Sequence, residues 1–339
     1  MMIREAIVRV SSGTDLTPAE AGGVMEEIMR GAATPAQIGG FLTALRMKGE
    51  TEAEIAAFAR AMRAAAVPVS LPAPEARVDT CGTGGDGAGT FNISTAAAFV
   101  AAGAGVPIVK HGNRGVSSRC GSADVLEALG VSVAIPADRV AEVLATAGIA
   151  FLFAPAYHPA MQHARIARQE IGIRTVFNLL GPLTNPAGAG AHLLGVYDPR
   201  LTVPVARVLG NLGVERAMVV HGAGLDEIAT AGPTTVGELR DGEVRAYTLD
   251  CTEFGIPQSP VAALRGGGPG ENAPTLLSVL EGDDGPARDI VLLNAGAAIY
   301  LGGKAGGIAG GIARAEVSID SGAALDRLRR LVEATGGGA

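Results

Sequence analysis

The chain has 339 residues, of which 48% are hydrophobic, so it is long and apolar enough to bury a large core in one or two domains. A formal net charge of −7, no Trp and only 4% aromatic residues argue against nucleic acid as the main partner. The three cysteines show neither disulfide nor zinc spacing, and no apolar run is long enough to span a membrane, so we expect a cytoplasmic protein with no membrane partner.

Residues 1–66 are predicted to form a bundle of short helices. The capping-box pattern, a Thr followed three positions later by Glu or Gln, starts at Thr17, Thr34 and Thr51. Apolar residues then recur at helical spacing, which indicates one buried face on each helix. Because about four short helices have little else to cover, we expect one face of the bundle to pack on another subunit.

A proline-rich stretch, residues 67–74, is predicted to be a semi-rigid connector. We place the domain boundary there, with a small α-helical domain at 1–70 and an α/β domain at 71–339. From residue 78 onward, short apolar runs alternate with helical segments, which predicts an α/β fold with a mostly parallel central sheet flanked by helices. The predicted strands span residues 106–109, 131–135, 149–153, 192–197, 217–221 and 244–249. Residues 252–288 are poorly periodic, and no element is assigned to them.

Residues 79–95 read as a glycine loop that runs into an alanine-rich helix. Five glycines between 82 and 89 allow the backbone to turn through positive φ and to present N–H groups to an anion. Ser94 and Thr95 follow at a predicted helix start, where unpaired N–H groups favour negative charge. No Gly-Lys-Ser/Thr follows the glycines, so this is not a Walker A loop. On sequence alone, a structural turn is the alternative to a phosphate-binding loop.

A second loop with anion-binding chemistry covers residues 110–124. It combines Lys110, Arg114 and Arg119 with three serines and three glycines, a mixture that suits a polyphosphate. The apolar run 106–109 places Lys110 at the end of a predicted buried strand, where ligands of α/β sheets bind. A solvated basic loop is the alternative interpretation.

Three segments resemble the signature loops of the anthranilate phosphoribosyltransferase family: Gly-Thr-Gly-Gly-Asp at 82–86, Asn-Ile-Ser-Thr at 92–95 and Lys-His-Gly-Asn-Arg at 110–114. The resemblance implies transfer of phosphoribosyl from 5-phosphoribosyl-1-diphosphate to the amino group of anthranilate, a step of tryptophan biosynthesis. It also implies two Mg²⁺ ions per subunit and a homodimer joined through the helical domain. The segment 158–186 would return to that domain and bring Arg168 to the acceptor.

The resemblance further implies roles for individual residues. Catalytic roles fall to Lys110, Asn113 and Arg168. Donor-binding roles fall to Gly82, Gly85, Asp86, Thr90, Asn92, Ile93, Ser94, Thr95, Lys110, His111, Gly112, Asn113, Arg114, Ser117, Ser118 and Ser122. Acceptor-binding roles fall to Gly82, His111, Asn113, Tyr157, Arg168 and Pro182, and magnesium-ligand roles to Ser94, Asp226 and Glu227.

Several of these residues have plainer explanations without the resemblance. Asp226 and Glu227 follow a predicted strand and suit Mg²⁺, but an Asp-Glu pair is more often a helix start. For Arg168, the alternative is a solvent-exposed arginine paired with Glu170 or another acid. His158 and His163 are five residues apart and do not share a helical face, so a metal pair is not expected.

The second loop departs from the family pattern at Gly115, Arg119 and Cys120, which leaves its diphosphate contacts open. We expect the loop 111–121 to be mobile when empty, with Cys120 exposed and readily alkylated. Two other functions are the alternatives to phosphoribosyl transfer. A pyrimidine-nucleoside phosphorylase would share the fold but not this combination of loops, and a nucleic-acid-binding relative would need a basic face.

Overall fold

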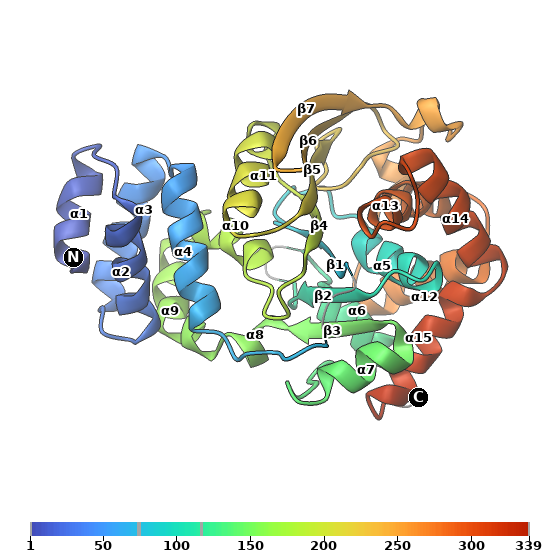
Figure 1. The fold of residues 1–339 in the computed structure, drawn as a ribbon, viewed down its shortest axis with the longest axis horizontal. Helices are drawn as coiled ribbons and strands as arrows, with labels where there is room; N and C mark the ends of the chain where they lie inside the picture. Colours follow the sequence, from blue (N-terminus) through green and yellow to red (C-terminus); the bar gives the residue numbers. More distant parts are fainter. Residues whose placement is uncertain (1, 73–75, 116–117, 338–339) are drawn as a thin grey trace.

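The computed structural model describes residues 2–72, 76–115 and 118–337. A small helical bundle lies beside a larger α/β part (Figure 1). The predicted capping boxes are confirmed, because Thr17, Thr34 and Thr51 each accept a hydrogen bond from the backbone N–H three residues later. The helices of the bundle are α1 (Ile3–Ser11), α2 (Pro18–Met29), α3 (Pro35–Lys48) and α4 (Glu52–Ala64).

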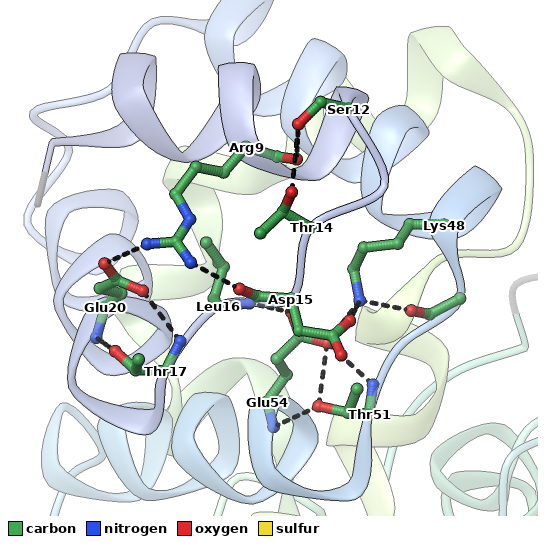
Figure 2. Close-up of polar contacts among 11 residues, drawn as sticks. Arg9, Ser12, Thr14, Asp15, Leu16, Thr17, Glu20, Lys48, Thr51 and Glu54 are labelled. Atoms are coloured by element: carbon green, nitrogen blue, oxygen red, sulfur yellow. Dashed lines mark hydrogen bonds and ion pairs between the residues drawn. The ribbon is translucent and has the colours of Figure 1, made fainter.

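A buried ion pair extends the capping box of α4 (Figure 2). The Glu54 carboxylate, which is fully buried, accepts hydrogen bonds from Lys48 Nζ at 2.9 Å and from Thr51 N at 2.8 Å. Its other oxygen accepts from Leu16 N at 2.9 Å. Lys48 Nζ also pairs with Asp15 at 2.6 Å. One carboxylate therefore links α3, α4 and the segment before α2.

The central sheet has seven strands in the order β3-β2-β1-β4-β5-β6-β7. The pairings from β3 to β5 are parallel, whereas β6 and β7 are antiparallel additions at one edge. The prediction of a mostly parallel sheet flanked by helices is confirmed. The strands are β1 (Val78–Gly82), β2 (Ile108–Gly112), β3 (Ile149–Phe153), β4 (Ala191–Gly195), β5 (Arg216–Gly222), β6 (Thr234–Arg240) and β7 (Glu243–Leu249).

One strand prediction was wrong, and two observed strands, β1 and β6, were not predicted. Residues 131–135 alternate between buried and exposed side chains as a strand would, but they pair with no neighbouring strand and remain irregular. Strand β6 was missed because Gly237 interrupts its pattern. A Cβ at Gly237 would lie 2.4 Å from the Thr202 carbonyl oxygen, so glycine lets α11 (Thr202–Asn211) approach the sheet.

Helices cover both faces of the sheet (Figure 1). On one face, α5 (Ile93–Gly103) and α13 (Pro286–Leu301) pack directly on the strands. On the other face, α11 packs on β5 and β6 and also against α4, so the core of the bundle continues into that of the sheet. The remaining helices of the α/β part are α6 (Ser122–Ala128), α7 (Val140–Ala147), α8 (Ala154–Tyr157), α12 (Pro269–Glu281), α14 (Ile308–Asp320) and α15 (Ala323–Ala334).

Helix α9 (Gln162–Ile171) leaves the α/β part and packs on α2 and α3 of the bundle. It leads into α10 (Val176–Leu183), which contacts α4. The boundary at residue 70 stays a prediction. Among the described residues, no helix combines the length and the apolar character needed to cross a membrane.

Candidate active site

The predicted site residues gather where the parallel strands end. The loop after β5 lies directly on the ends of β1 and β4, because glycine stands at both contact points. A Cβ at Gly195 would lie 1.6 Å from the Asp226 carbonyl oxygen, and one at Gly82 would lie 2.4 Å from Asp226 Oδ2. These two glycines therefore allow the acidic loop to reach the glycine loop.

Both acids of that loop bind backbone N–H groups of the predicted phosphate loop. Asp226 Oδ2 accepts from Gly84 N at 2.7 Å, and Glu227 Oε1 accepts from Ser94 N at 3.1 Å. Burial and the nearby Asp86 carboxylate raise the pKa of Asp226 to about 7. Burial and the neighbouring Asp226 also raise the pKa of Glu227 well above its ordinary value. A bound cation reduces the repulsion between carboxylates that lie this close together.

Of the predicted magnesium ligands, Ser94 and Glu227 are thus hydrogen-bonded to each other, and Asp226 is the chain neighbour of Glu227. A hydroxyl and two carboxylates are a hard oxygen donor set, which fits Mg²⁺. Lys110, the middle residue of β2 and not its end as predicted, is almost fully buried and donates from Nζ to the Thr80 carbonyl and, at 3.2 Å, to Ser94 Oγ. Burial lowers the pKa of Lys110, and the surrounding acids oppose that effect.

The rest of the glycine loop runs from Gly84 to Thr90. Gly84 and Gly85 adopt φ values of +65° and +77°, which favour glycine. Asp86 Oδ1 accepts from Ala88 N at 3.1 Å, and Thr90 forms an isolated bridge with Arg265. Ile93 and Thr95 are buried in the first turn of α5, so any donor contact from them would involve backbone groups.

The second loop is closed at its base. Asp124 Oδ2 accepts from both Gly115 N and Gly121 N, each at 2.8 Å. A Cβ at Gly121 would lie 2.3 Å from Gly115 N, and one at Gly115 would lie 2.6 Å from the Ser118 carbonyl oxygen. Glycine at 115, a departure from the family pattern, is therefore required by the close approach of two backbone segments.

Polar residues of this loop mostly contact each other. Ser122 Oγ donates to the Asn113 carbonyl at 3.3 Å, and Ser118 Oγ donates to the Cys120 carbonyl at 3.3 Å. Asn92 Nδ2 donates to the same Cys120 carbonyl at 3.3 Å, which joins the loop to the start of α5. A Cβ at Gly112 would lie 2.2 Å from Ser122 Oγ. Ser117 lies outside the described residues.

Arg114 and Cys120 differ from expectation. Arg114 is half exposed, but its guanidinium is held by Glu127 at 2.5 and 2.7 Å and by Asp124 at 3.1 Å. Cys120 is 6% exposed, so the expectation of an exposed, reactive thiol is wrong. Burial, with a contribution from Asp124, raises the pKa of Cys120 to about 11.

Two of the predicted acceptor residues, Arg168 and Pro182, lie on α9 and α10. Arg168 lies with its guanidinium carbon 5.1 Å from the ring centre of Phe177 and is partly buried, which lowers its pKa. His111 Nδ1 lies 3.1 Å from the Gly181 carbonyl oxygen, next to Pro182. Burial and the adjacent His158 lower the pKa of His111 to about 3, so this ring is neutral near pH 7.

Tyr157 does not join this group. It is 1% exposed, and its hydroxyl donates to the Ile135 carbonyl at 2.6 Å. The sequence analysis missed Asp79, whose carboxylate accepts from His111 N at 3.2 Å and from Asn185 Nδ2 at 2.8 Å. Its place on the strand entering the glycine loop is the signal that could have indicated a supporting role.

Asp79 also belongs to a buried cluster with Cys81 and His192, in which one ligand atom from each residue lies within 4.8 Å of the others. These side chains occupy alternate positions of β1 and a paired position of β4, on the opposite face of the sheet from Lys110. Because the Asp79 carboxylate already accepts two hydrogen bonds, we interpret the cluster as support for His111.

The architecture agrees with comparisons to known proteins. The helical bundle domain of a glycosyl transferase family matches residues 4–66, and the α/β domain of the same family matches residues 75–325. The protein is therefore a two-domain glycosyl transferase.

Curated relatives narrow the assignment. Anthranilate phosphoribosyltransferase of Methanocorpusculum labreanum is 60% identical over 336 residues, covering 99% of both chains. The enzyme of that name from Pelotomaculum thermopropionicum is 59% identical, covering 99% of this chain and 97% of its own. The chain belongs to the anthranilate phosphoribosyltransferase family, so the resemblance stated from its loops is confirmed.

Solved structures give the same result. The anthranilate phosphoribosyltransferase of Thermus thermophilus superposes with a TM-score of 0.93 at 47% identity, covering 98% of this chain and 99% of that one. The enzyme from Saccharomyces cerevisiae in complex with PRPP and Mg has a TM-score of 0.90 at 30% identity, covering 98% of each chain. The yeast enzyme has also been solved in complex with 4-fluoroanthranilate.

Proposed function

We propose that this chain transfers phosphoribosyl from 5-phosphoribosyl-1-diphosphate to the amino group of anthranilate, releasing diphosphate, in tryptophan biosynthesis. The observation that carries the proposal is that Lys110 and Glu227 both bind Ser94, while Asp226 binds Gly84 of the glycine loop. Hydroxyl and carboxylate oxygens suited to a metal, next to a glycine loop at the ends of the parallel strands, support this proposal.

Departure of diphosphate leaves positive charge on the anomeric carbon of the ribose. Catalysis therefore depends on stabilising the leaving group and positioning the acceptor more than on a strong base. Mg²⁺ held by Ser94, Asp226 and Glu227 would neutralise the charge on diphosphate, and we propose two ions per subunit because Asp86 supplies a third carboxylate nearby. The Lys110 ammonium, which is hydrogen-bonded to Ser94 Oγ, would stabilise the same negative charge.

The acceptor side needs residues that bind and orient anthranilate. Arg168 is proposed to face its carboxylate, since a planar guanidinium suits that group. We propose that anthranilate is also oriented by contacts with Asn113, the Gly82 backbone and Pro182. His111 is assigned a binding role only, because its ring is neutral and a neutral arylamine is already nucleophilic.

The proposed assembly is a homodimer joined through the helical bundle. Val8 on α1 and Met47 on α3 are 68% and 84% exposed, which leaves apolar surface for a second subunit to cover. A double substitution, Val8→Asp with Met47→Asp, is expected to convert the dimer to a monomer in light-scattering measurements.

The three cysteines are free and buried, which suits a reducing cytoplasm.

The reaction is tested by measuring diphosphate release with anthranilate, beside phosphorolysis of thymidine and uridine. We expect release only with anthranilate and only with a divalent metal. Full turnover in excess chelator would contradict the metal requirement, and phosphorolysis without transfer would favour a nucleoside phosphorylase instead.

A further inference from the structure

An arginine outside the predicted site lies against the glycine loop. Arg174 is exposed in the short connection between α9 and α10. The position of a Cβ at Gly85 would be 3.9 Å from Arg174 Cδ, Cζ and Nη1. The guanidinium therefore reaches the turn of the loop from the side of the helical bundle.

The aromatic ring of a tyrosine packs against the guanidinium of Arg174. The guanidinium carbon of Arg174 lies 4.5 Å from the ring centre of Tyr197, close enough for a cation–π interaction. Tyr197 N in turn donates to Thr83 Oγ1 at 3.1 Å, and Thr83 N donates to the Gly195 carbonyl at 2.9 Å. The arginine, its supporting ring and the glycine loop thus form one connected unit after β4.

The charge of Arg174 is not neutralised by the described part of the chain, because no ion pair joins it to a carboxylate there. Arg114, which the sequence analysis assigned to the donor, is held by Glu127 and Asp124 instead. A planar guanidinium with free donors beside a loop of backbone N–H groups is suited to a phosphate group.

We propose that Arg174, positioned by Tyr197, binds the diphosphate end of the phosphoribosyl donor. The inference rests on the proposed function. Diphosphate is favoured over the 5-phosphate because Arg174 lies beside Gly85, and the N–H of the preceding residue, Gly84, binds Asp226. Asp226 is one of the proposed magnesium ligands, and Mg²⁺ is commonly held in part by substrate phosphates.

Calorimetric titration of the full-length protein with magnesium diphosphate tests the proposal directly. Loss of a charge-assisted contact in Arg174→Ala is expected to raise the Kd about tenfold, with Arg174→Lys intermediate because it keeps charge but loses the planar fork. Tyr197→Leu should weaken binding less than Arg174→Ala, and Tyr197→Phe should match the wild type because the ring is kept.

Arg165→Ala is the matched control, since it removes another exposed arginine, from α9, for which the described residues show no hydrogen bond or ion pair with the loop. It should bind magnesium diphosphate as the wild type does. Ribose 5-phosphate is the second probe, and its affinity should be the same in Arg174→Ala and the wild type. An unchanged Kd for magnesium diphosphate in Arg174→Ala, or a loss confined to ribose 5-phosphate, overturns the proposal.

These measurements need no turnover, so they separate this inference from the proposed reaction. If the wild type binds magnesium diphosphate in an Arg174-dependent way but transfers nothing to anthranilate, the reaction is wrong and the binding residue stands. If transfer occurs but binding does not depend on Arg174, only the inference fails.

Discussion

Arg168 is a cation that the fold keeps partly out of water, with the face of its guanidinium toward Phe177. A partly desolvated guanidinium interacts strongly with a carboxylate. We predict that Arg168→Ala raises the KM for anthranilate by about tenfold to a hundredfold while the KM for the donor changes little, because one charged hydrogen-bonding contact is lost. Steady-state kinetics with each substrate varied in turn measure this.

Arg165→Ala again provides the control, because it removes the same charge from the exposed side of the same helix. Equal increases in both KM values for Arg168→Ala would count against its assignment to the acceptor.

Cys120 illustrates how burial overrides local charge. Arg119 next to it suggested an activated thiol, yet the side chain is buried and its pKa rises from 9.0 to about 11. We predict that alkylation at pH 8 is at least about a hundredfold slower in the folded protein than in urea, since two pKa units remove that much thiolate. The rate should increase as the pH rises toward 11.

Peptide mass spectrometry after timed alkylation gives the rate for each cysteine. Cys81 and Cys251 are also buried and should be slow in the folded protein. Rapid native labelling of Cys120 alone would show that the loop opens without ligand.

At the scale of elements, local signals in the sequence identified what local physics decides. Capping boxes fixed the starts of α2, α3 and α4, because each is satisfied by residues three positions apart. The composition of the glycine loop and of the second loop likewise predicts phosphate-binding segments, which stays a prediction. The irregular conformation of residues 131–135 could not be predicted locally, because an alternating pattern forms a strand only when a neighbouring strand pairs with it.

Contacts between distant segments account for the other differences. Gly237 in β6 faces α11, and the pairing of Arg114 with Glu127 joins a loop to a later helix. Arg174 carries no motif, and its position beside Gly85 depends on how α9 and α10 cross between the domains. Such contacts are set by the folded chain as a whole and leave no periodic trace in sequence.

The ion pair at the start of α4 allows a stability prediction for an element. Glu54→Ala would leave Lys48 buried with Asp15 as its remaining partner and would free the backbone N–H groups of Leu16 and Thr51. We predict a loss of about 3 kcal/mol in the free energy of unfolding, measured with urea. Lys48→Met combined with Glu54→Leu should recover part of this loss.

Glu52→Ala is the comparison, because Glu52 pairs with Arg207 across an exposed surface at 3.2 Å. Its loss should stay below about 1 kcal/mol. Similar losses for both substitutions would show that burial of Glu54 adds nothing to its contribution.

For the whole molecule, one apolar core joins the helical bundle to the sheet. Phe41 and Phe58 of the bundle belong to the same buried cluster as Leu194 of β4 and Val219 of β5. We predict that both parts unfold in one transition, because separating them would expose this shared surface. Far-UV circular dichroism and tyrosine fluorescence should give coincident urea curves, and an early loss of helix alone would contradict this.

The double hydrogen bond of Asp124 to Gly115 and Gly121 has a consequence for sequence divergence. A carboxylate that clamps both ends of a loop fixes where the chain leaves and re-enters the site, whatever lies between. Substitutions at intervening positions are then tolerated if they leave those two amides in place, and two of the departures from the family pattern, Arg119 and Cys120, fall there. We therefore expect relatives to keep Asp124 and Gly121 while positions 119 and 120 vary, so sequence changes at those two positions report drift in loop contacts rather than a change of reaction.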